Sequence, residues 1–235
     1  LMFLHSSFNV PRSSFPMRFL LRLAFRLLYN EFAFTYDLVS WAVSVGQWRE
    51  WQRQVIPRIV GERVLEVAHG TGDLQIDLAA AGYKPVAFDL SPNMGRIAKR
   101  KLAQRGLFPP FVRGKVQTLP FPSGHFTTIV STFPSEFIVD PEAEREFHRV
   151  LAPGGRVVFV PAATIIPAHI ADRLAQWLFD VTGQSTAPQA DGSGWPPKLM
   201  QSYRAVGFEI KIESVKLPRS MAWVVVAQKA AAESA

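Results

Sequence analysis

The most informative part of this 235-residue chain reads Val64-Leu65-Glu66-Val67-Ala68-His69-Gly70-Thr71-Gly72-Asp73. It opens with a short, mostly apolar run typical of a buried strand, and a helical pattern begins after Gly72. Gly70 and Gly72 allow the backbone to turn tightly and to approach a ligand closely, and the first N–H groups of the following helix have no partner within it. The stretch therefore predicts a strand, a small-residue turn and a helix that together border a ligand site.

A carboxylate stands at the end of the next predicted strand. Asp89 follows Gly70 by nineteen residues and closes the apolar run 85–89. An acidic side chain in this position accepts hydrogen bonds from the two hydroxyls of a ribose. A glycine turn alone is weak evidence, but the turn together with Asp89 predicts a cofactor that contains adenosine.

From residue 61 onward the chain alternates short apolar runs with helical patterns. This alternation predicts an α/β fold of the Rossmann type, with a mostly parallel sheet and helices on both faces. The last two strands are joined by the short segment Lys216-Leu217-Pro218-Arg219-Ser220, which cannot form a crossover, so one strand is expected to run antiparallel. The seven expected strands are 63–68, 85–89, 110–113, 126–132, 156–160, 208–215 and 222–228. The expected helices are 73–80, 91–105, 141–151, 167–181 and 196–205, and residues 47–55 are also helical in pattern.

The same residues resemble the first motif of the class I S-adenosylmethionine-dependent methyltransferases, in which an acidic residue precedes alternating glycines. Further segments match that family in order and spacing, and the resemblance spans roughly residues 31–230. It implies S-adenosyl-L-methionine as the cofactor and disfavours a nicotinamide dehydrogenase, whose fingerprint lacks the later segments. Those segments are Asp89-Leu90-Ser91-Pro92-Asn93-Met94, Leu119-Pro120-Phe121 and Arg149-Val150-Leu151-Ala152-Pro153-Gly154-Gly155.

The resemblance assigns cofactor contacts by position. It implies that Glu66 lies near the amino end of the cofactor's methionine portion, that residues 68–72 face this portion, and that Asp89 holds the ribose. Leu90 and Met94 are expected beside the adenine. The full expected cofactor-binding set is Glu66, Ala68, His69, Gly70, Thr71, Gly72, Asp89, Leu90, Met94, Val116, Gln117 and Thr132.

Three residues depart from the family's pattern. Ala68 replaces the first glycine, which is tolerable where its backbone angles stay in an ordinary region. Lys115 stands where the family usually has Asp or Asn to accept a hydrogen bond from the adenine amino group, and an ammonium group only donates. Adenine recognition is therefore expected to rest on backbone groups around Val116 and Gln117, or to be weaker. Thr127 replaces another commonly acidic residue.

The composition limits the classes of protein. Hydrophobic residues make up 48% and charged residues 19%, so we expect a full core and exclude a disordered chain. Cysteine is absent, which excludes disulfides, cysteine-based zinc sites and a thiol nucleophile and favours a cytoplasmic protein. The five histidines, at positions 5, 69, 125, 148 and 169, lack the spacing of metal ligands, so no metal is expected.

The formal net charge of +7 is concentrated near the beginning of the chain. Arg18, Arg22 and Arg26 recur every four residues and share one face of an expected helix that is otherwise apolar. Arginine interrupts each apolar run, so we expect neither a transmembrane span nor a signal peptide. Residues 15–30 are interpreted as a basic helix on a membrane surface, or as a helix packed on its own domain. No later basic patch interleaves with aromatics, so nucleic acid is not expected as a partner.

Two segments bear on the substrate. Phe32-Ala33-Phe34-Thr35-Tyr36-Asp37-Leu38 and Gly46-Gln47-Trp48-Arg49-Glu50-Trp51 resemble the N-terminal signature of ubiquinone and menaquinone methyltransferases and of bacterial phospholipid N-methyltransferases. In those enzymes this region lies over the cofactor, so we expect a basic helix and lid in residues 1–45 and the methyltransferase domain in residues 46–235. The long connection 161–197 carries an apolar stripe, which suits either a substrate cover or a helix packed on the sheet.

Methyl transfer depends mainly on alignment of the nucleophile behind a sulfonium methyl group. A phenol or a carbon acid also needs a proton acceptor, for which the candidates are Glu136, His69 and Tyr36. The competing interpretations are that His69 caps backbone groups of the turn and that Glu136 favours the start of a helix.

We therefore expect methyl transfer to an apolar, membrane-resident acceptor such as a quinol or a lipid. Peripheral attachment to the inner face of the membrane is part of the same hypothesis. One alternative is a soluble small-molecule acceptor. The other is a non-catalytic, methyltransferase-like scaffold, which the departures at Ala68, Lys115 and Thr127 suggest. The oligomeric state is not predicted.

Overall fold

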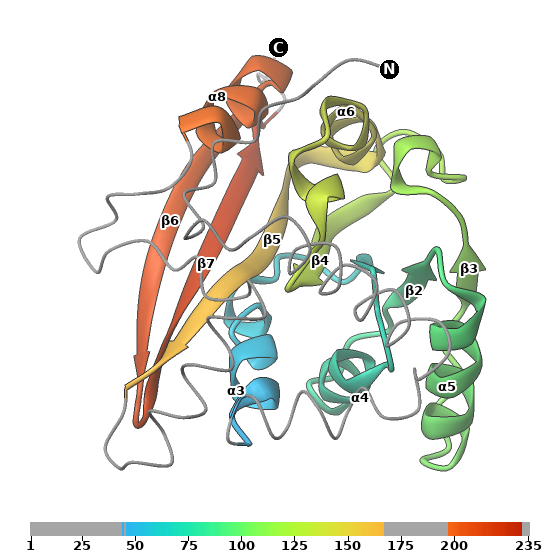
Figure 1. Cartoon of the computed structure of the whole chain (residues 1–235). Coiled ribbons are helices and arrows are strands. Elements are labelled where there is room, and N and C mark those ends of the chain that lie inside the picture. Colours follow the sequence, from blue (N-terminus) through green and yellow to red (C-terminus); the bar gives the residue numbers. More distant parts are fainter. Residues whose placement is uncertain (1–43, 45, 167–196, 232–235) are drawn as a thin grey trace, which may run out of the picture.

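The computed structural model describes residues 44, 46–166 and 197–231 (Figure 1). The basic segment 15–30, the candidate Tyr36 and the expected helix 167–181 lie outside the described residues.

A seven-stranded sheet in the order β3-β2-β1-β4-β5-β7-β6 forms the centre of the described part. Neighbouring strands from β3 to β5 pair in parallel, whereas β7 is antiparallel to both β5 and β6. The expected mostly parallel sheet with one antiparallel strand is confirmed. The strands are β1 (Val64–Val67), β2 (Val86–Asp89), β3 (Phe111–Arg113), β4 (Phe126–Thr132), β5 (Leu151–Ile165), β6 (Phe208–Leu217) and β7 (Ser220–Lys229).

The strand β5 is longer at both ends than the sequence pattern predicts. Leu151 already pairs with Phe126, and a register shift before Thr128 accommodates the Pro-Gly-Gly turn inside the strand. At the other end β5 continues past Pro161. A second register shift interrupts its pairing with β7 at this point, so the proline, which has no N–H, is not required to donate a hydrogen bond to β7. Two local irregularities thus replace two expected strand ends.

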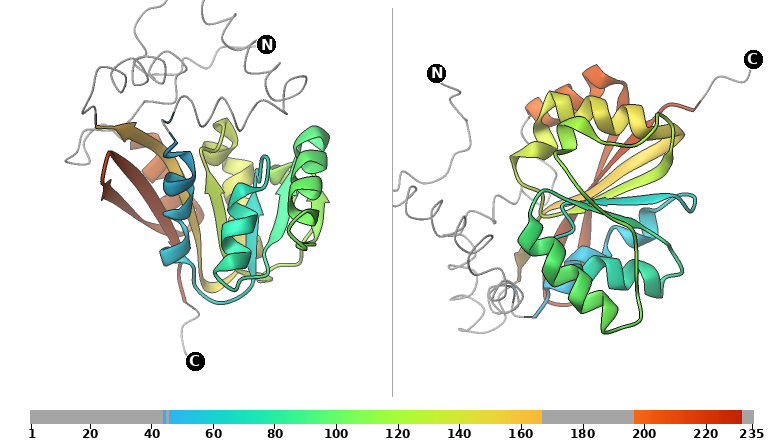
Figure 2. Two further views of the ribbon diagram at one scale, coloured as in Figure 1. Left: turned by 90° about the horizontal axis from the view of Figure 1, so that it is seen from below. Right: turned by 90° about the vertical axis from the view of Figure 1, so that its right-hand side faces the viewer.

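Helices cover both faces of the sheet, as expected. Figure 2 shows α3, α4 and α5 side by side over one face, and α6 and α8 cover the other. These helices are α3 (Trp48–Arg53), α4 (Asp73–Ala80), α5 (Pro92–Ala103), α6 (Pro141–Val150) and α8 (Pro197–Val206). The short 3₁₀ helices are η2 (Ile56–Arg58), η3 (Val116–Thr118) and η4 (Glu136–Val139).

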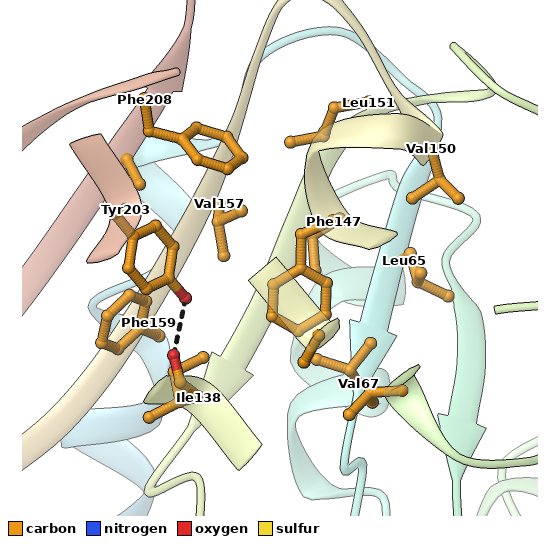
Figure 3. Packing of buried hydrophobic residues seen from close by; sticks show 14 of the residues in the cluster. Leu65, Val67, Ile138, Phe147, Val150, Leu151, Val157, Phe159, Tyr203 and Phe208 are labelled. Atoms are coloured by element: carbon orange, nitrogen blue, oxygen red, sulfur yellow. Dashed lines mark hydrogen bonds between the residues drawn. The ribbon is translucent and has the colours of Figure 1, made fainter. Parts of the chain in front are cut away.

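The main core lies between the sheet and the α6/α8 layer (Figure 3). Phe147 of α6 and Tyr203 of α8 are fully buried there, together with Phe159 of β5. The Tyr203 hydroxyl donates a hydrogen bond to the Ile138 carbonyl at 3.0 Å, so this large polar side chain is satisfied within the core. On the other face Val55, near α3, joins residues of α4 against β4 and β5.

The short helix α3 is fixed to α4 by a buried carboxylate. Asp77 accepts hydrogen bonds from Arg49 Nε at 2.9 Å and Nη2 at 2.8 Å, and from Arg53 Nη2 at 3.1 Å. Such a two-pronged arginine–carboxylate contact fixes direction as well as distance. The clamp therefore holds the face of α3 that carries Trp48 and Gln52 over the carboxyl ends of the central strands.

No helix in the described ranges is long and apolar enough to cross a membrane.

Candidate active site

A cavity of about 820 Å³ opens at the carboxyl edge of the parallel strands. Ligands of open α/β sheets bind at this edge, where the strand order reverses. The cavity walls are the segments that follow β1 to β4, namely 68–71, 89–92, 113–117 and 132–135, with Trp48 and Gln52 added from α3.

The turn after β1 has an unusual backbone. Ala68 adopts φ +55°, so the condition of ordinary backbone angles, under which an alanine is tolerated in this turn without strain, is not met. A left-handed conformation costs an alanine on the order of 1 kcal/mol. Gly70 also has φ +55°, and a Cβ atom built on it would meet nothing within 4 Å, so its Cα borders open space. The turn thus leaves room for a ligand beside its backbone.

Gly72 serves helix packing, because a Cβ atom there would lie 2.7 Å from a methyl group of Leu102 and 3.0 Å from Ala98 Cβ. Its φ of +84° also favours glycine. Gly72 is not among the described residues that line the cavity.

Asp89 is held rigidly at the end of β2. Its Oδ2 accepts a hydrogen bond from Gly70 N–H at 3.0 Å, and its Oδ1 accepts one from Ser91 N–H at 2.7 Å. Each carboxylate oxygen can still accept a second hydrogen bond, and the side chain lines the cavity. The geometry suits a pair of adjacent hydroxyls such as those of a ribose.

Glu66 lies behind the turn and is not among the described residues that line the cavity. Its side chain is fully buried, and Gln75 Nε2 donates a hydrogen bond to its Oε2 at 2.6 Å. Burial raises the pKa of Glu66 to about 8, because a carboxylate loses its hydration there. Glu66 is therefore mostly protonated at neutral pH in the free protein.

His69 is buried and faces the β3 side of the cavity. Its Nδ1 lies 2.9 Å from the Gly70 carbonyl oxygen, which only accepts, so Nδ1 carries the proton. The ring meets Phe111 of β3 edge-on, with centroids 5.3 Å apart. Burial lowers the pKa of His69, which keeps the imidazole neutral. This position favours the interpretation in which His69 stabilises the turn.

The opposite end of the cavity is aromatic. Trp48 stacks on Phe133, with ring centroids 4.1 Å apart and an interplanar angle of 21°. Phe133 follows β4 directly and adopts φ +49°, while its N–H donates a hydrogen bond to the Val160 carbonyl at 2.7 Å. Phe137 of η4 also lines this end.

An unpaired oxygen lies in the same wall. Gln52 Nε2 donates a hydrogen bond to Thr132 Oγ1 at 3.2 Å, whereas Gln52 Oε1 is buried and has no hydrogen-bond partner among the described residues. A buried acceptor without a partner is costly unless a ligand supplies a donor. The sequence analysis missed Gln52 and Phe133 as site residues, and only the resemblance around residues 46–51 pointed to this part of the chain.

The structure brings most, but not all, of the expected cofactor residues to the cavity. Met94 is fully buried, and its N–H donates a hydrogen bond to Ser91 Oγ. It lies behind the wall with Glu66 and Gly72. The expected residues that line the cavity are Ala68, His69, Gly70, Thr71, Asp89, Leu90, Val116, Gln117 and Thr132.

The three catalytic candidates are not brought together. Glu136 is exposed and is not among the described residues that line the cavity. Tyr36 lies outside the described residues, and His69 lies at the end away from Phe133. Their catalytic roles stay predictions. Within the described ranges no group of three or more His, Asp or Glu side chains is placed to hold a metal ion.

The residues present fit S-adenosylmethionine. Asp89 can accept bonds from ribose hydroxyls, the space beside Gly70 leaves room along the turn, and Gln52 Oε1 offers an acceptor for an ammonium group. Such a group on the β4 side would provide the donor that this oxygen lacks.

Comparisons with known proteins agree with this geometry. Residues 64–155 match the family model described as "Methyltransferase domain". A demethylmenaquinone methyltransferase from Thermus thermophilus is 38% identical over 137 residues, which cover 56% of this chain and 62% of the relative. The chain thus spans about three fifths of that relative's length. A demethylmenaquinone methyltransferase from Deinococcus radiodurans is 28% identical over 216 residues, covering 84% of this chain and 90% of the relative.

Among solved structures, a putative S-adenosyl-L-methionine-dependent methyltransferase from Methanococcus maripaludis has a TM-score of 0.61 at 17% identity. The match covers 86% of this chain and 93% of the other and shows a shared fold. The matched domain, the strand order and the cavity lead to one conclusion. Residues 64–155 match a methyltransferase domain, and the cavity at the carboxyl edge of the parallel strands fits S-adenosyl-L-methionine as the cofactor.

Proposed function

We propose that the protein methylates a ring carbon of an apolar hydroquinone of the demethylmenaquinol type. The observation that carries this proposal is the stacked pair Trp48 and Phe133 at the β4 end of the cavity. Flat aromatic walls favour planar, apolar ligands, because offset stacking adds to the burial of apolar area. The names of the sequence relatives support the same substrate class.

The aromatic wall is built at a cost. A phenylalanine with positive φ is strained, and such strain persists only where surrounding contacts over-determine it. Here the Trp48 stack and the 2.7 Å hydrogen bond to Val160 hold Phe133 in place. Strain at the end of a central strand supports a role for Phe133 in the site, since a relaxed residue would serve the fold alone.

The bound cofactor supplies an electrophilic methyl group on a sulfonium centre. In the overall reaction a carbon–carbon bond forms to the acceptor ring, the carbon–sulfur bond breaks with its electron pair going to sulfur, and the ring releases a proton. The protein's main contribution is alignment. Asp89 and the turn after β1 fix one side of the reacting pair, and the wall around Phe133 orients the ring.

The test is methylation of chemically reduced demethylmenaquinone by the full chain with labelled S-adenosylmethionine. The key variant is Phe133→Ala, and Phe108→Ala is the matched control, because Phe108 is an 80% exposed aromatic residue that does not line the cavity. We expect Phe133→Ala to raise the quinol KM by about 10-fold, as the loss of one buried aromatic contact implies. Binding of S-adenosylhomocysteine should change by less than about 3-fold.

Two outcomes would overturn the proposal. One is turnover of soluble phenols or of phospholipids in preference to the quinol. The other is tight cofactor binding without turnover of any of these acceptors, which would favour the scaffold alternative.

Attachment to a membrane belongs to the same proposal, because a quinol of this type resides in the bilayer. The arginines of residues 15–30 would bind anionic lipid headgroups. Flotation with anionic liposomes should be lost when residues 1–30 are deleted, and equal flotation of both chains would contradict this part.

A further inference from the structure

The base end of the cavity is formed by two loops that are tied together. Gly114 N–H donates a hydrogen bond to the Asp89 carbonyl at 3.2 Å, and Arg113 Nε donates one to the Leu90 carbonyl at 3.1 Å. Because Asp89 is suited to the ribose, the adenine of a bound cofactor would lie between these loops. The next question is which side chain reads its edge.

Adenine presents an exocyclic amino group that needs an acceptor. Of residues 113–117, Arg113 and Lys115 carry side chains that only donate, whereas Gly114 and Val116 have no polar side chain. Gln117 has a side-chain carbonyl oxygen and lines the cavity. It is therefore the one side chain of this loop that can accept a hydrogen bond from the amino group.

Asp140 fixes the direction of the Gln117 amide. Gln117 Nε2 donates a hydrogen bond to Asp140 Oδ2 at 2.8 Å, and Asp140 Oδ1 caps α6 by accepting Glu142 N–H at 2.9 Å. Both bonds stabilise the ionised carboxylate, and the hydrogen bond from Gln117 is the main reason that the pKa of Asp140 is lowered. A carboxylate only accepts, so a flipped amide would bring two acceptors together. Gln117 Oε1 is thereby held away from Asp140.

We propose that Gln117 Oε1 selects adenine by accepting a hydrogen bond from its amino group, and that Asp140 acts through Gln117 as a positioning residue. This inference rests on S-adenosylmethionine as the cofactor and goes beyond the choice of methyl acceptor. It also explains how the site reads adenine although Lys115 cannot accept a hydrogen bond.

The test compares two ligands by calorimetry on the full chain. S-adenosyl-L-homocysteine carries the amino group, and S-inosyl-L-homocysteine carries a carbonyl oxygen in its place, which would face Gln117 Oε1. We expect the unsubstituted protein to bind the adenosyl compound at least about 10-fold more tightly, since a buried pair of acceptors replaces a hydrogen bond.

The variant Gln117→Met keeps the length of the side chain and removes the amide. We expect this change to reduce the preference to less than about 3-fold. Gln104→Met is the matched control, because Gln104 is exposed at the end of α5, away from the cavity, and should keep the full preference.

Asp140→Asn gives a second, independent outcome. Asparagine caps helices about as well as aspartate, so its oxygen can still accept Glu142 N–H. Its amide nitrogen then faces Gln117 and would turn the Gln117 oxygen toward residue 140 and its NH₂ group toward the cavity. We therefore expect Asp140→Asn to shift the preference toward the inosyl compound.

An unchanged adenosyl preference in both variants would overturn the inference and leave the proposed methyl transfer intact. Failure of the unsubstituted protein to bind S-adenosylhomocysteine would instead overturn the cofactor on which both rest.

Discussion

The buried acid Glu66 makes the stability of the fold depend on pH in an unusual direction. In the folded protein its pKa is raised from 4.5 to about 8, mainly by burial, while the unfolded chain should titrate near the lower value. The folded state then holds a proton that the unfolded state releases as pH rises. The contribution of Glu66 to stability is therefore fully present below pH 4.5 and is lost as pH rises through about 8.

The substitution Glu66→Gln removes this titration and keeps the shape of the side chain. With 1.36 kcal/mol for each pH unit between the two pKa values, the free energy of unfolding of Glu66→Gln should rise relative to the unsubstituted protein by about 4 kcal/mol between pH 5 and pH 8.5. At pH 7 the titration of Glu66 has removed about 3 kcal/mol from the unsubstituted protein. This value is a substantial fraction of the usual free energy of unfolding of a domain, about 5–15 kcal/mol.

The assay is urea denaturation followed by circular dichroism at intervals from pH 5 to pH 8.5. Glu62→Gln is the matched control, because it makes the same replacement at an exposed position. A stability difference between Glu66→Gln and the unsubstituted protein that stays constant over this pH range would refute the reasoning. It would mean that Glu66 titrates alike in the folded and unfolded states.

Three further predictions concern the same edge of the sheet. Ala68→Gly should raise the free energy of unfolding by about 1 kcal/mol in denaturant titrations, because glycine adopts φ +55° without strain; a destabilised variant would contradict this. Asp89→Ala should weaken S-adenosylhomocysteine binding by at least about 10-fold in calorimetry, through the loss of a charged acceptor, and equal affinity would show that Asp89 does not hold the ribose. His69→Asn should weaken cofactor binding while the pH dependence of kcat stays unchanged, because the ring supports the turn at the end away from Phe133. Loss of the acidic limb, with activity no longer falling as pH drops through the pKa of residue 69, would instead establish His69 as the general base.

Much of the fold follows from local patterns in the sequence. The strand, the glycine turn and the start of the helix are adjacent in residues 64–73. Their order of apolar and small residues therefore predicts the local structure without knowledge of tertiary contacts. The antiparallel strand follows from the short connection between β6 and β7. In the structure only Pro218 and Arg219 of this connection are not paired in the sheet. The ends of β5 were not readable, because Pro161 and the Pro-Gly-Gly turn are typical of strand ends and here mark irregularities within a strand.

The site is less readable than the fold because distant parts of the chain build it. Gln52 and Trp48 reach the cavity only because Asp77 holds α3, and nothing in the local pattern of residues 47–55 indicates that contact. The exposed position of Glu136 depends on the direction in which η4 leaves β4. Residue type alone also gave no sign that Ala68 would take a left-handed conformation.

The costs at this edge of the sheet form a consistent pattern. Ala68 and Phe133 hold strained backbone angles, and Gln52 leaves a buried oxygen without a partner among the described residues. Glu66 adds an acid that must stay protonated in the free protein at neutral pH. No other non-glycine residue in the described part of the chain has a positive φ. A buried polar group that borders a ligand site, as Gln52 does, gains its missing partner when the ligand supplies one. A cationic amino-acid end beside Gln52 would give its oxygen a donor, so this edge of the sheet is shaped for the bound state at the expense of the free one.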